Sequence, residues 1–327
     1  MQHLVSVIMP AYNSGRYLAE SVRSVQAQTF GGWELVVVDD GSADDTGEVA
    51  RRLAAADVRV RYVRRPNGGQ AAARNTGLGA ARGALVAFLD ADDLWLPEKL
   101  EAQLEVMERT GVDLVYTDGY FFSEEGAASE EERFHILPGE ARGEELFRTL
   151  FTSNRIGTLS VLVKREALDA VGLFDEDRTY QNCEDYDLWL RLAKWGASFY
   201  GMEEKLMRYR RHAAATTSTA SKLLAPMLAV TLKHAPDSSL DPALAKQRVR
   251  GLYRDLISAL VAEGRVEEAR RRMREFYTWD GGAPVTALQR LVLRLLPRRY
   301  NYISREVLYR AEWHVRGLLG RPGELKR

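Results

Sequence analysis

The sequence predicts an α/β fold in which a mostly parallel sheet is flanked by helices and followed by a helical C-terminal region. In the first 120 residues, short apolar runs rich in β-branched side chains alternate with stretches whose apolar residues recur at helical spacing. Such alternation indicates parallel strands covered by helices on both faces. From about Leu223 onward the pattern is helical, with proline and glycine only as punctuation.

The expected strands and helices of the N-terminal part follow the chain in a regular order. Strands are expected over five apolar runs: Val5–Met9, Glu34–Val38, Val58–Val63, Leu85–Leu89 and Asp113–Tyr116. Apolar residues at helical spacing lie between them, as in Tyr17, Val22 and Val25 and in Leu100, Leu104 and Met107. Because ligands bind beyond the carboxyl ends of parallel strands, the polar clusters after these runs are the places to search for a site.

The later part of the chain begins with a different composition. Residues 123–145 are acidic and poor in large apolar side chains, which predicts a solvated loop. A strand is then expected over Leu159–Val163 and a helix over Tyr186–Trp195. A Glu/Arg-rich helix with good i,i+4 pairing is expected over Glu263–Phe276.

The charge balance and the cysteine count argue against several classes of protein. The 327 residues contain 46 Lys and Arg and 46 Asp and Glu, so the net charge is zero, which argues against a nucleic-acid partner. The single cysteine, Cys183, permits no intrachain disulfide, and no Cys/His cluster has the spacing of zinc ligands. No apolar stretch reaches the ~18 residues of a membrane span, and the N-terminus lacks the pattern of a signal peptide. We therefore expect a cytoplasmic protein.

Two acids, Asp39 and Asp40, follow the second expected strand and precede Gly41. Their carboxylates would lie at the edge of the sheet where a ligand binds. The alternative is an Asx turn that caps the next helix, and the pattern alone favours neither.

Three acids within four residues follow the fourth expected strand: Asp90, Asp92 and Asp93. Carboxylates this close repel one another unless a cation or hydrogen-bond donors lie among them. Oxygen ligands suit Mg²⁺ or Mn²⁺, which usually bind few carboxylates and complete their shell with substrate phosphates and water. The alternative is helix capping ahead of Pro97, but one cap needs only one acid, so we favour a metal site.

A glycine-containing segment, Asn67–Asn75, lies between the two acidic clusters. Gly68 and Gly69 allow tight backbone geometry, and Arg74 follows in the opening turns of the next helix. A helix N-terminus combined with a guanidinium suits a phosphate. The alternative is that Arg74 is an ordinary surface charge.

Glu184 and Asp185 come directly before the helix expected over Tyr186–Trp195. One of them could act as a general base that takes a proton from an attacking hydroxyl. The alternative is that they only stabilise the helix, because its dipole favours acids at its start. His212 lies among cations, and a lone histidine is more often structural than a ligand. Cys183 is expected to be a small buried residue rather than an activated nucleophile.

Taken together and in this order, the motifs resemble those of family 2 glycosyltransferases, enzymes with the GT-A fold, a DXD motif and a nucleotide-sugar donor. The resemblance runs from about Val5 to His212 and rests on five separated motifs: VSVIMPAYN, VVVDDGSADDT, NGGQAAARNTG, FLDADDLWLP and CEDYDLWLRL. The segment LVKREALDAVGLFDE, Leu162–Glu176, also fits the stretch between the metal motif and the base. The fold that the resemblance implies is GT-A, with a Rossmann-like sheet.

The resemblance implies a nucleotide-binding role for one group of residues. Asp39 would bind the base or ribose, and Asp90 would contact the ribose or a metal-bound water. The full nucleotide-binding group is Pro10, Ala11, Tyr12, Asp39, Asp40, Gly69, Arg74, Asp90 and Ala91. Pro10, Ala11 and Tyr12 would line the base.

The resemblance also implies the metal ligands and the base. Asp92, the last acid of the DXD motif, would bind Mn²⁺ or Mg²⁺ directly, with His212 approaching the metal and the diphosphate. Asp185 matches the catalytic base, and Glu184 is the second choice. The implied reaction is an inverting, single-displacement transfer from a nucleoside diphosphate sugar to an acceptor hydroxyl in bacterial polysaccharide, glycolipid or glycan assembly.

The domain organisation and the substrates are expected as follows. Residues 1–215 would form the catalytic domain, with nucleotide-sugar binding in 1–120 and the acceptor side in 121–215; residues 216–327 would form the helical C-terminal region. UDP is the first expectation for the donor nucleotide, with dTDP and GDP as alternatives. The acceptor would be a glycan, a lipid-linked glycan or a small molecule.

Three other functions fit parts of the pattern. A Rossmann dehydrogenase requires a glycine-rich turn after the first strand, but here the turn Pro10–Gly15 holds one glycine. A nucleotidyltransferase would also use a metal and carboxylates, but would not need Asp185 as a base. A non-catalytic nucleotide-sugar-binding scaffold is the third alternative, although none of the motifs is missing.

The last 42 residues, Thr286–Arg327, are basic, with ten Lys or Arg against three Asp or Glu. Leu288, Leu291, Val292, Leu295 and Leu296 form an apolar stripe beside four arginines. Such a helix can lie on an anionic membrane, which would place the protein peripherally on its inner face. The alternative is packing against the catalytic domain or against a second subunit in a homodimer.

Overall fold

The computed structural model describes residues 4–123, 136–212 and 219–280. By its internal contacts the chain divides into two compact units, Met1–Leu252 and Tyr253–Arg327. The basic C-terminal stretch with its expected membrane helix, residues 286–327, lies outside the described residues. Within the described part, no helix combines the length and the apolar character that spanning a bilayer requires.

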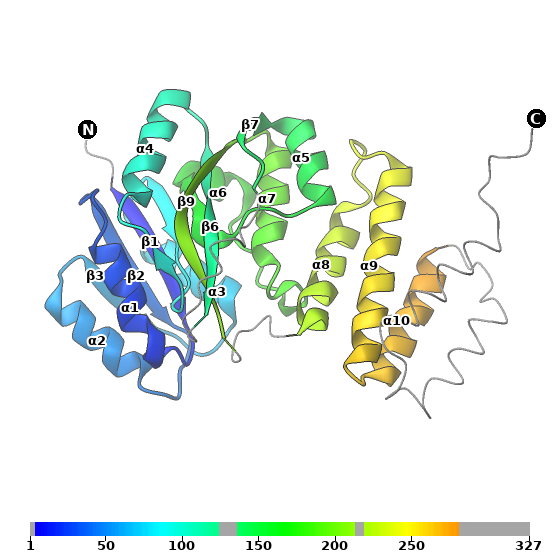
Figure 1. Ribbon diagram of the computed structural model, residues 1–327, viewed down its shortest axis with the longest axis horizontal. Helices are drawn as coiled ribbons and strands as arrows, with labels where there is room; N and C mark the ends of the chain where they lie inside the picture. Colours follow the sequence, from blue (N-terminus) through cyan, green and yellow to red (C-terminus); the bar gives the residue numbers. More distant parts are fainter. Residues whose placement is uncertain (1–3, 124–135, 213–218, 281–327) are drawn as a thin grey trace, which may run out of the picture. The chain divides into compact units, whose positions relative to one another are not determined.

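The first unit is built on one mixed sheet (Figure 1). Its strand order is β3-β2-β1-β4-β8-β6-β9-β5, and β7 pairs with β9 outside this path. The strands are β1 (Val5–Ala11), β2 (Trp33–Asp39), β3 (Val60–Arg64), β4 (Leu85–Phe88), β5 (Leu94–Trp95), β6 (Leu114–Ser123), β7 (Gly139–Arg142), β8 (Val161–Lys164) and β9 (Ser198–Arg211).

The sheet is parallel in its N-terminal half and mixed beyond it. β3, β2, β1 and β4 are parallel neighbours, whereas β8 inserts antiparallel between β4 and β6. β6 and β9 are parallel to each other and continue well past the other strands. Most expected strands are found within a few residues of their expected bounds, but β6 continues to Ser123, well beyond the expected end at Tyr116. The predicted α/β fold with a mostly parallel sheet is confirmed.

Helices cover both faces of the sheet. They are α1 (Gly15–Gln26), α2 (Thr46–Ala56), α3 (Gln70–Ala80), α4 (Lys99–Thr110), α5 (Gly143–Thr152), α6 (Arg165–Val171), α7 (Glu184–Trp195) and α8 (Ala220–His234). Side chains alternate between faces along a strand, so neighbouring residues enter different cores. Val7 belongs to the core shared with α1, α2 and α4, and Ile8 belongs to the core shared with α3 and α5–α7. Two buried cores, one on each face, therefore fix the sheet between the helices.

The prediction of a loop over residues 123–145 is wrong at both described ends of this segment. Ser123 still belongs to β6, residues 139–142 form β7, and α5 begins at Gly143. The helix forms because four large apolar side chains of α5 are buried in the core: Leu146, Phe147, Leu150 and Phe151. β7 is held as a short edge strand by antiparallel pairing with β9. Residues 124–135 lie outside the described part.

The first unit continues beyond residue 215, where we expected the catalytic domain to end. α8 belongs to this unit because Val230 is buried in its core and Lys233 contacts α7. The helix α9 (Pro242–Ala262) crosses the division at Leu252. In the second unit, Tyr253 of α9 packs against Phe276 of α10 (Val266–Trp279), with 5.3 Å between ring centroids.

Candidate active site

The carboxyl ends of β1, β2 and β4 meet at one edge of the sheet. β1 ends level with Asp39 of β2, and Asp40 continues the pairing by donating its N–H to the carbonyl of Ala11 (2.9 Å). β4 ends at Phe88, two residues before Asp90. Parallel pairing therefore brings both acidic clusters to the same edge, as the sequence predicts.

Asp39 is buried and already hydrogen-bonded. Its Oδ1 accepts from the N–H of Ser42 (2.8 Å), and its Oδ2 accepts from the Tyr62 hydroxyl (2.9 Å). Burial, and then this hydrogen bond to a carboxylate, raise the pKa of Tyr62. The bond to Ser42 closes a turn that ends before α2 begins, so it fixes the carboxylate beside the end of β1 and does not cap that helix.

Asp40 holds the glycine-containing loop against the sheet. Its carboxylate accepts from the N–H groups of Gly68 (3.0 Å) and Gly69 (2.8 Å), and Nη1 of Arg65 lies 3.2 Å away. Gly69 has a φ of +92°, a conformation that side-chain-bearing residues rarely adopt. Asp40 and Gly69 therefore shape the entry into α3, which carries Arg74.

Arg74 joins the DXD motif to the start of α7. Its side chain is buried, and its Nη2 donates to Oδ1 of Asp90 (2.8 Å) while its Nη1 donates to Oε1 of Glu184 (2.5 Å). Although burial lowers it, the charges of Asp90 and Glu184 raise the pKa of Arg74. The guanidinium is a buried bridge between two carboxylates rather than an ordinary surface charge.

The three acids after β4 have different surroundings. Oδ2 of Asp92 lies 2.9 Å from Nε2 of His212, which brings the two expected metal ligands into contact. Burial, and then the charge of Asp90, raise the pKa of Asp92. Asp93 is fully buried, and its Oδ1 accepts the N–H of Arg210 (2.7 Å), so it joins the motif to β9.

Asp92 and His212 fit a divalent cation that takes most of its ligands from elsewhere. The described residues contain no cluster of three or more His, Cys, Asp or Glu that would enclose a metal. The Asp92 side chain is 32% exposed, so its oxygens can reach a metal at the surface of the site. Nδ1 of His212 is buried and has no hydrogen-bond partner among the described residues. Two protein ligands plus phosphate and water suit Mg²⁺ or Mn²⁺.

Glu184 and Asp185 differ in their burial and in the charge of their hydrogen-bond partners. Glu184 is buried; Oε1 accepts from Arg74 and Oε2 accepts the N–H of Asn182 (2.7 Å). Asp185 is half-buried; Oδ2 accepts from the Thr158 hydroxyl (2.6 Å) and Oδ1 from the N–H of Tyr186 (2.7 Å). Burial, and then the charge of Glu184, raise the pKa of Asp185 to about 6. A carboxylate with a pKa near neutrality is suited to general-base work.

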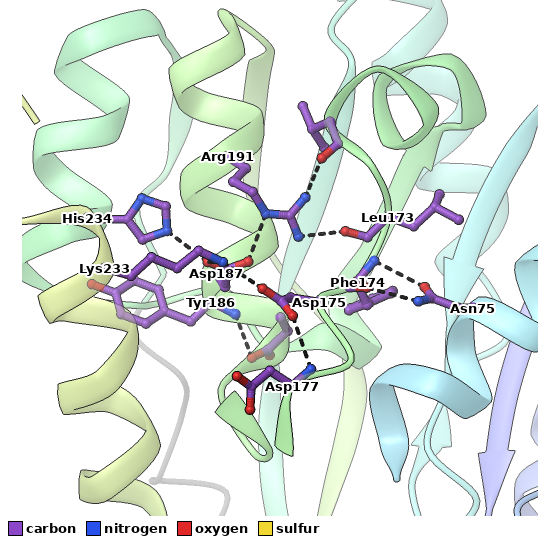
Figure 2. Close-up of polar contacts among 12 residues, drawn as sticks. Asn75, Leu173, Phe174, Asp175, Asp177, Tyr186, Asp187, Arg191, Lys233 and His234 are labelled. Carbon is purple, nitrogen blue, oxygen red and sulfur yellow. Dashed lines mark hydrogen bonds and ion pairs between the residues drawn. The ribbon is translucent and has the colours of Figure 1, made fainter. Parts of the chain in front are cut away.

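A cluster of polar side chains around the buried Asp187 holds α7 in place (Figure 2). Asp187 is fully buried, and its carboxylate accepts from Nε of Arg191 (2.8 Å) and contacts Nζ of Lys233 (2.9 Å) and Nε2 of His234 (2.8 Å). Although burial raises it, these partners lower the pKa of Asp187. Arg191 also donates to the carbonyls of Val171 and Leu173. The helix that carries Asp185 is thereby tied to α6 and α8.

Sequence reasoning missed this cluster and Thr158. Asp187 is visible in the sequence only as one more acid at the start of a helix. Its partner His234 lies 47 positions away in α8, and Thr158 lies 27 positions before Asp185. No short-range spacing links these residues, so the sequence contains no signal for either contact.

The other expected nucleotide-binding residues lie at the same edge. Pro10 and Ala11 are buried at the end of β1, and Tyr12 follows with 54% of its surface exposed. Ala91 is buried, and its carbonyl accepts from the Ser21 hydroxyl (3.0 Å). Of these residues, Tyr12 is the one that presents an exposed ring.

Residues 6–172 match the sequence profile described as Glycosyl transferase family 2. The chain is also 36% identical over 208 residues to TuaG of Bacillus subtilis, whose name assigns it to teichuronic acid biosynthesis; the match covers 63% of this chain and 79% of that protein. The chain belongs to glycosyltransferase family 2. A second relative, 32% identical over 193 residues, is the UDP-Glc:alpha-D-GlcNAc-diphosphoundecaprenol beta-1,3-glucosyltransferase WfgD of Escherichia coli; the match covers 59% of this chain and 70% of WfgD.

Solved structures of glycosyltransferases share the fold. TarS of S. aureus, residues 1–349 in complex with UDP-GlcNAc, matches with a TM-score of 0.57 and 19% identity, covering 78% of this chain and 72% of that one. The mannosyltransferase PcManGT of Pyrobaculum calidifontis, in complex with GDP-Man and Mn²⁺, matches with a TM-score of 0.56 and 19% identity, covering 97% and 88%. The resemblance to family 2, the GT-A fold and the assignment as a glycosyltransferase are thereby confirmed.

Proposed function

We propose that this family 2 glycosyltransferase moves a sugar from a nucleoside diphosphate sugar to an acceptor hydroxyl, with inversion at the anomeric carbon and with the help of Mn²⁺ or Mg²⁺. The observation that carries the proposal is the contrast between Glu184 and Asp185. Glu184 is buried in an ion pair with Arg74, whereas Asp185 is half-buried with a pKa raised to about 6.

The donor would lie at the edge where β1, β2 and β4 end. Tyr12 offers an exposed ring against which a base can stack, and Asp39 lies beside it at the end of β2. UDP is the first expectation for the nucleotide, and dTDP and GDP are alternatives. Support comes from WfgD, whose name states a UDP-Glc donor, and from the neighbours solved with UDP-GlcNAc and GDP-Man.

Asp92 and His212 are proposed to hold the metal, with Asp90 beside them. A divalent cation there would supply positive charge against the departing diphosphate. The charge of Asp90 disfavours the ionised form of Asp92, and a cation beside the two carboxylates would relieve this repulsion.

In the proposed reaction, the acceptor oxygen attacks C1 of the donor sugar while its proton passes to Asp185. The bond from C1 to the diphosphate oxygen breaks, and the nucleoside diphosphate leaves. One displacement inverts the anomeric carbon. A retaining route through a covalent intermediate would need a second carboxylate near the sugar, and Glu184 is engaged by Arg74 and Asn182. WfgD supports a lipid-linked glycan as acceptor, because its name states a diphosphoundecaprenol-linked sugar.

Calorimetry with UDP, dTDP, GDP, ADP and CMP, each with and without Mn²⁺, tests the donor site. Metal-dependent binding of one nucleoside diphosphate is expected and would identify the donor class. The corresponding nucleotide sugar is then incubated with the enzyme, with water or an added sugar as acceptor, and NMR of the first product reports its anomeric configuration. No binding of any nucleotide would favour the non-catalytic scaffold, and retention would contradict the single displacement.

A further inference from the structure

Thr158 places a hydroxyl directly on the carboxylate of Asp185. Its Oγ1 lies 2.6 Å from Oδ2 of Asp185, and only 6% of Thr158 is exposed. The other oxygen, Oδ1, accepts the N–H of Tyr186 at 2.7 Å. Each carboxylate oxygen thus receives one donor from the protein and keeps lone pairs for a further hydrogen bond. The two donors together limit rotation of the carboxylate about its bond to Cβ.

The turn that carries Thr158 is fixed from outside. Residues Thr158–Ser160 form a short 3₁₀ helix ahead of β8. The indole N–H of Trp95 donates to the carbonyl of Leu159 (2.8 Å), and Nε2 of Gln103 donates to the carbonyl of Ser160 (2.8 Å). Trp95 and Gln103 are both buried, so these hydrogen bonds are shielded from water.

The amide of Gln103 is itself oriented by a buried lysine. Nζ of Lys99 donates to Oε1 of Gln103 (2.6 Å), which leaves Nε2 free to donate to the carbonyls of Val115 (3.1 Å) and Ser160. Nζ of Lys99 also lies 4.1 Å from the ring centroid of Trp95. Lys99, Trp95 and Gln103 therefore form one packed group under the turn. Trp95 follows the DXD motif by three positions, so this group links the expected metal site to the base.

We propose that Thr158 is a positioning residue for this glycosyltransferase, and that its hydroxyl holds the Asp185 carboxylate in the orientation that accepts the proton of the acceptor. This inference rests on the proposed role of Asp185 as the base. The charged groups that act on Asp185 are Glu184, which disfavours its ionised form, and Arg74, which favours it. The hydroxyl of Thr158 also favours the ionised form, because it donates to the carboxylate.

Thr158→Val removes the hydroxyl and keeps the shape of the side chain, and Thr158→Ser keeps the hydroxyl. Ser160→Ala is the matched control, because the Ser160 hydroxyl donates to the carbonyl of Gly157 in the same turn and does not contact Asp185. For each variant, kcat is measured as a function of pH. The assay follows release of the nucleoside diphosphate from a nucleotide sugar of the class that calorimetry identifies. The donor dissociation constant and the melting temperature are measured on the same preparations.

Thr158→Val is expected to lower kcat about tenfold on the plateau, the pH range in which the wild-type rate is level. It should also shift the acid limb, the range in which kcat falls toward low pH, upward by about one pH unit, which is equivalent to about 1.4 kcal/mol. Its donor affinity should stay within twofold of wild type. Thr158→Ser should keep both the plateau and the acid limb. Ser160→Ala should lower the melting temperature without moving the acid limb. If Thr158→Val does not fold, Thr158→Ala serves as the second hydroxyl-free variant, with the same expectation.

A hydroxyl-free variant with the wild-type plateau and acid limb would overturn the inference, and so would Thr158→Ser losing as much activity as Thr158→Val. Asp185→Asn separates this failure from failure of the proposed function. If Asp185→Asn abolishes transfer while Thr158→Val behaves as wild type, only the positioning role is wrong. If Asp185→Asn itself keeps the wild-type rate, the assignment of the base is wrong.

Discussion

Arg74 of α3 and Glu184 of α7 form a buried ion pair across 110 positions of the sequence. Each side chain is 3% exposed. The second arm of the guanidinium binds Asp90 of the DXD motif (2.8 Å), so one side chain connects the proposed donor site to the helix that carries Asp185. Removing Arg74 leaves Glu184 buried without its cation, which gives the first prediction.

Arg74→Met is expected to lower the free energy of unfolding by about 3–5 kcal/mol, because Glu184 stays buried without its cation. The double variant Arg74→Met/Glu184→Met should recover part of this loss, because an apolar pair carries no desolvation penalty. Chemical denaturation of the wild type, both single variants and the double variant gives the four free energies of unfolding of a double-mutant cycle. A double variant whose loss equals the sum of the single losses would show that the pair is not coupled.

Asp92→Ala is expected to abolish the Mn²⁺ dependence of nucleotide binding, because it removes the exposed carboxylate that contacts His212. Calorimetry with and without Mn²⁺ measures the effect. Asp93→Asn is the control within the same motif. Burial raises the pKa of Asp93 well above its usual range, so an amide resembles its protonated form and can still accept the N–H of Arg210. Equal loss of metal dependence in both variants would contradict the assignment of Asp92.

Asp187→Asn is expected to destabilise the fold near neutral pH by about 3–5 kcal/mol, because it breaks a buried charged cluster. The pKa of Asp187 is lower in the folded than in the unfolded chain, so its contribution is present above about pH 5 and is lost as the pH falls through about 4 and below. The difference in the free energy of unfolding between Asp187→Asn and the wild type should therefore become smaller as the pH falls.

Unfolding in urea at pH 7 and at about pH 2.5, which lies below the unfolded pKa of an aspartate, tests this dependence on pH. Asp175→Asn is the control, because Asp175 contacts the same lysine, Lys233 (2.8 Å), but its side chain is 35% exposed. Its effect should stay below about 1 kcal/mol at both pH values. If the difference in the free energy of unfolding between Asp187→Asn and the wild type were the same at the two pH values, the charge of Asp187 would contribute nothing to folding.

The sequence predicts best those elements whose side chains are buried on both faces. β1 and β2 are buried at every position and mostly apolar, with Ser6, Glu34 and Asp39 as the polar exceptions, and a run of β-branched residues signals such strands directly. The sequence does not predict β9, because charged residues interrupt its apolar positions over Met202–Arg211 and no continuous apolar run marks it. β7 has no buried position and exists only through its pairing with β9.

The candidate site divides in the same way. The acids at the ends of β2 and β4 could be predicted, because parallel strands place their carboxyl ends at one edge. The choice between Glu184 and Asp185 could not be made from the residues alone, because adjacent acids at a helix start look alike. In the structure the two acids have different partners, both distant in the sequence. Arg74 forms an ion pair with Glu184, and the Thr158 hydroxyl donates a hydrogen bond to Asp185. Such contacts join α7 to α3 and to the 3₁₀ turn that carries Thr158, and no local pattern encodes them.

Asp185→Asn is expected to lower kcat about 10²–10⁴-fold, because an amide cannot take the proton of the acceptor hydroxyl. Donor affinity should be unchanged, since the variant keeps the shape of the side chain. In the wild type, kcat should fall as the pH falls through about 6, because the base must be ionised and its pKa is raised to that value. Glu184→Gln should instead lower stability, because it leaves Arg74 buried with one carboxylate fewer. A wild-type rate that is flat from pH 5 to pH 8, or an Asp185→Asn variant with unchanged kcat, would contradict Asp185 as the base.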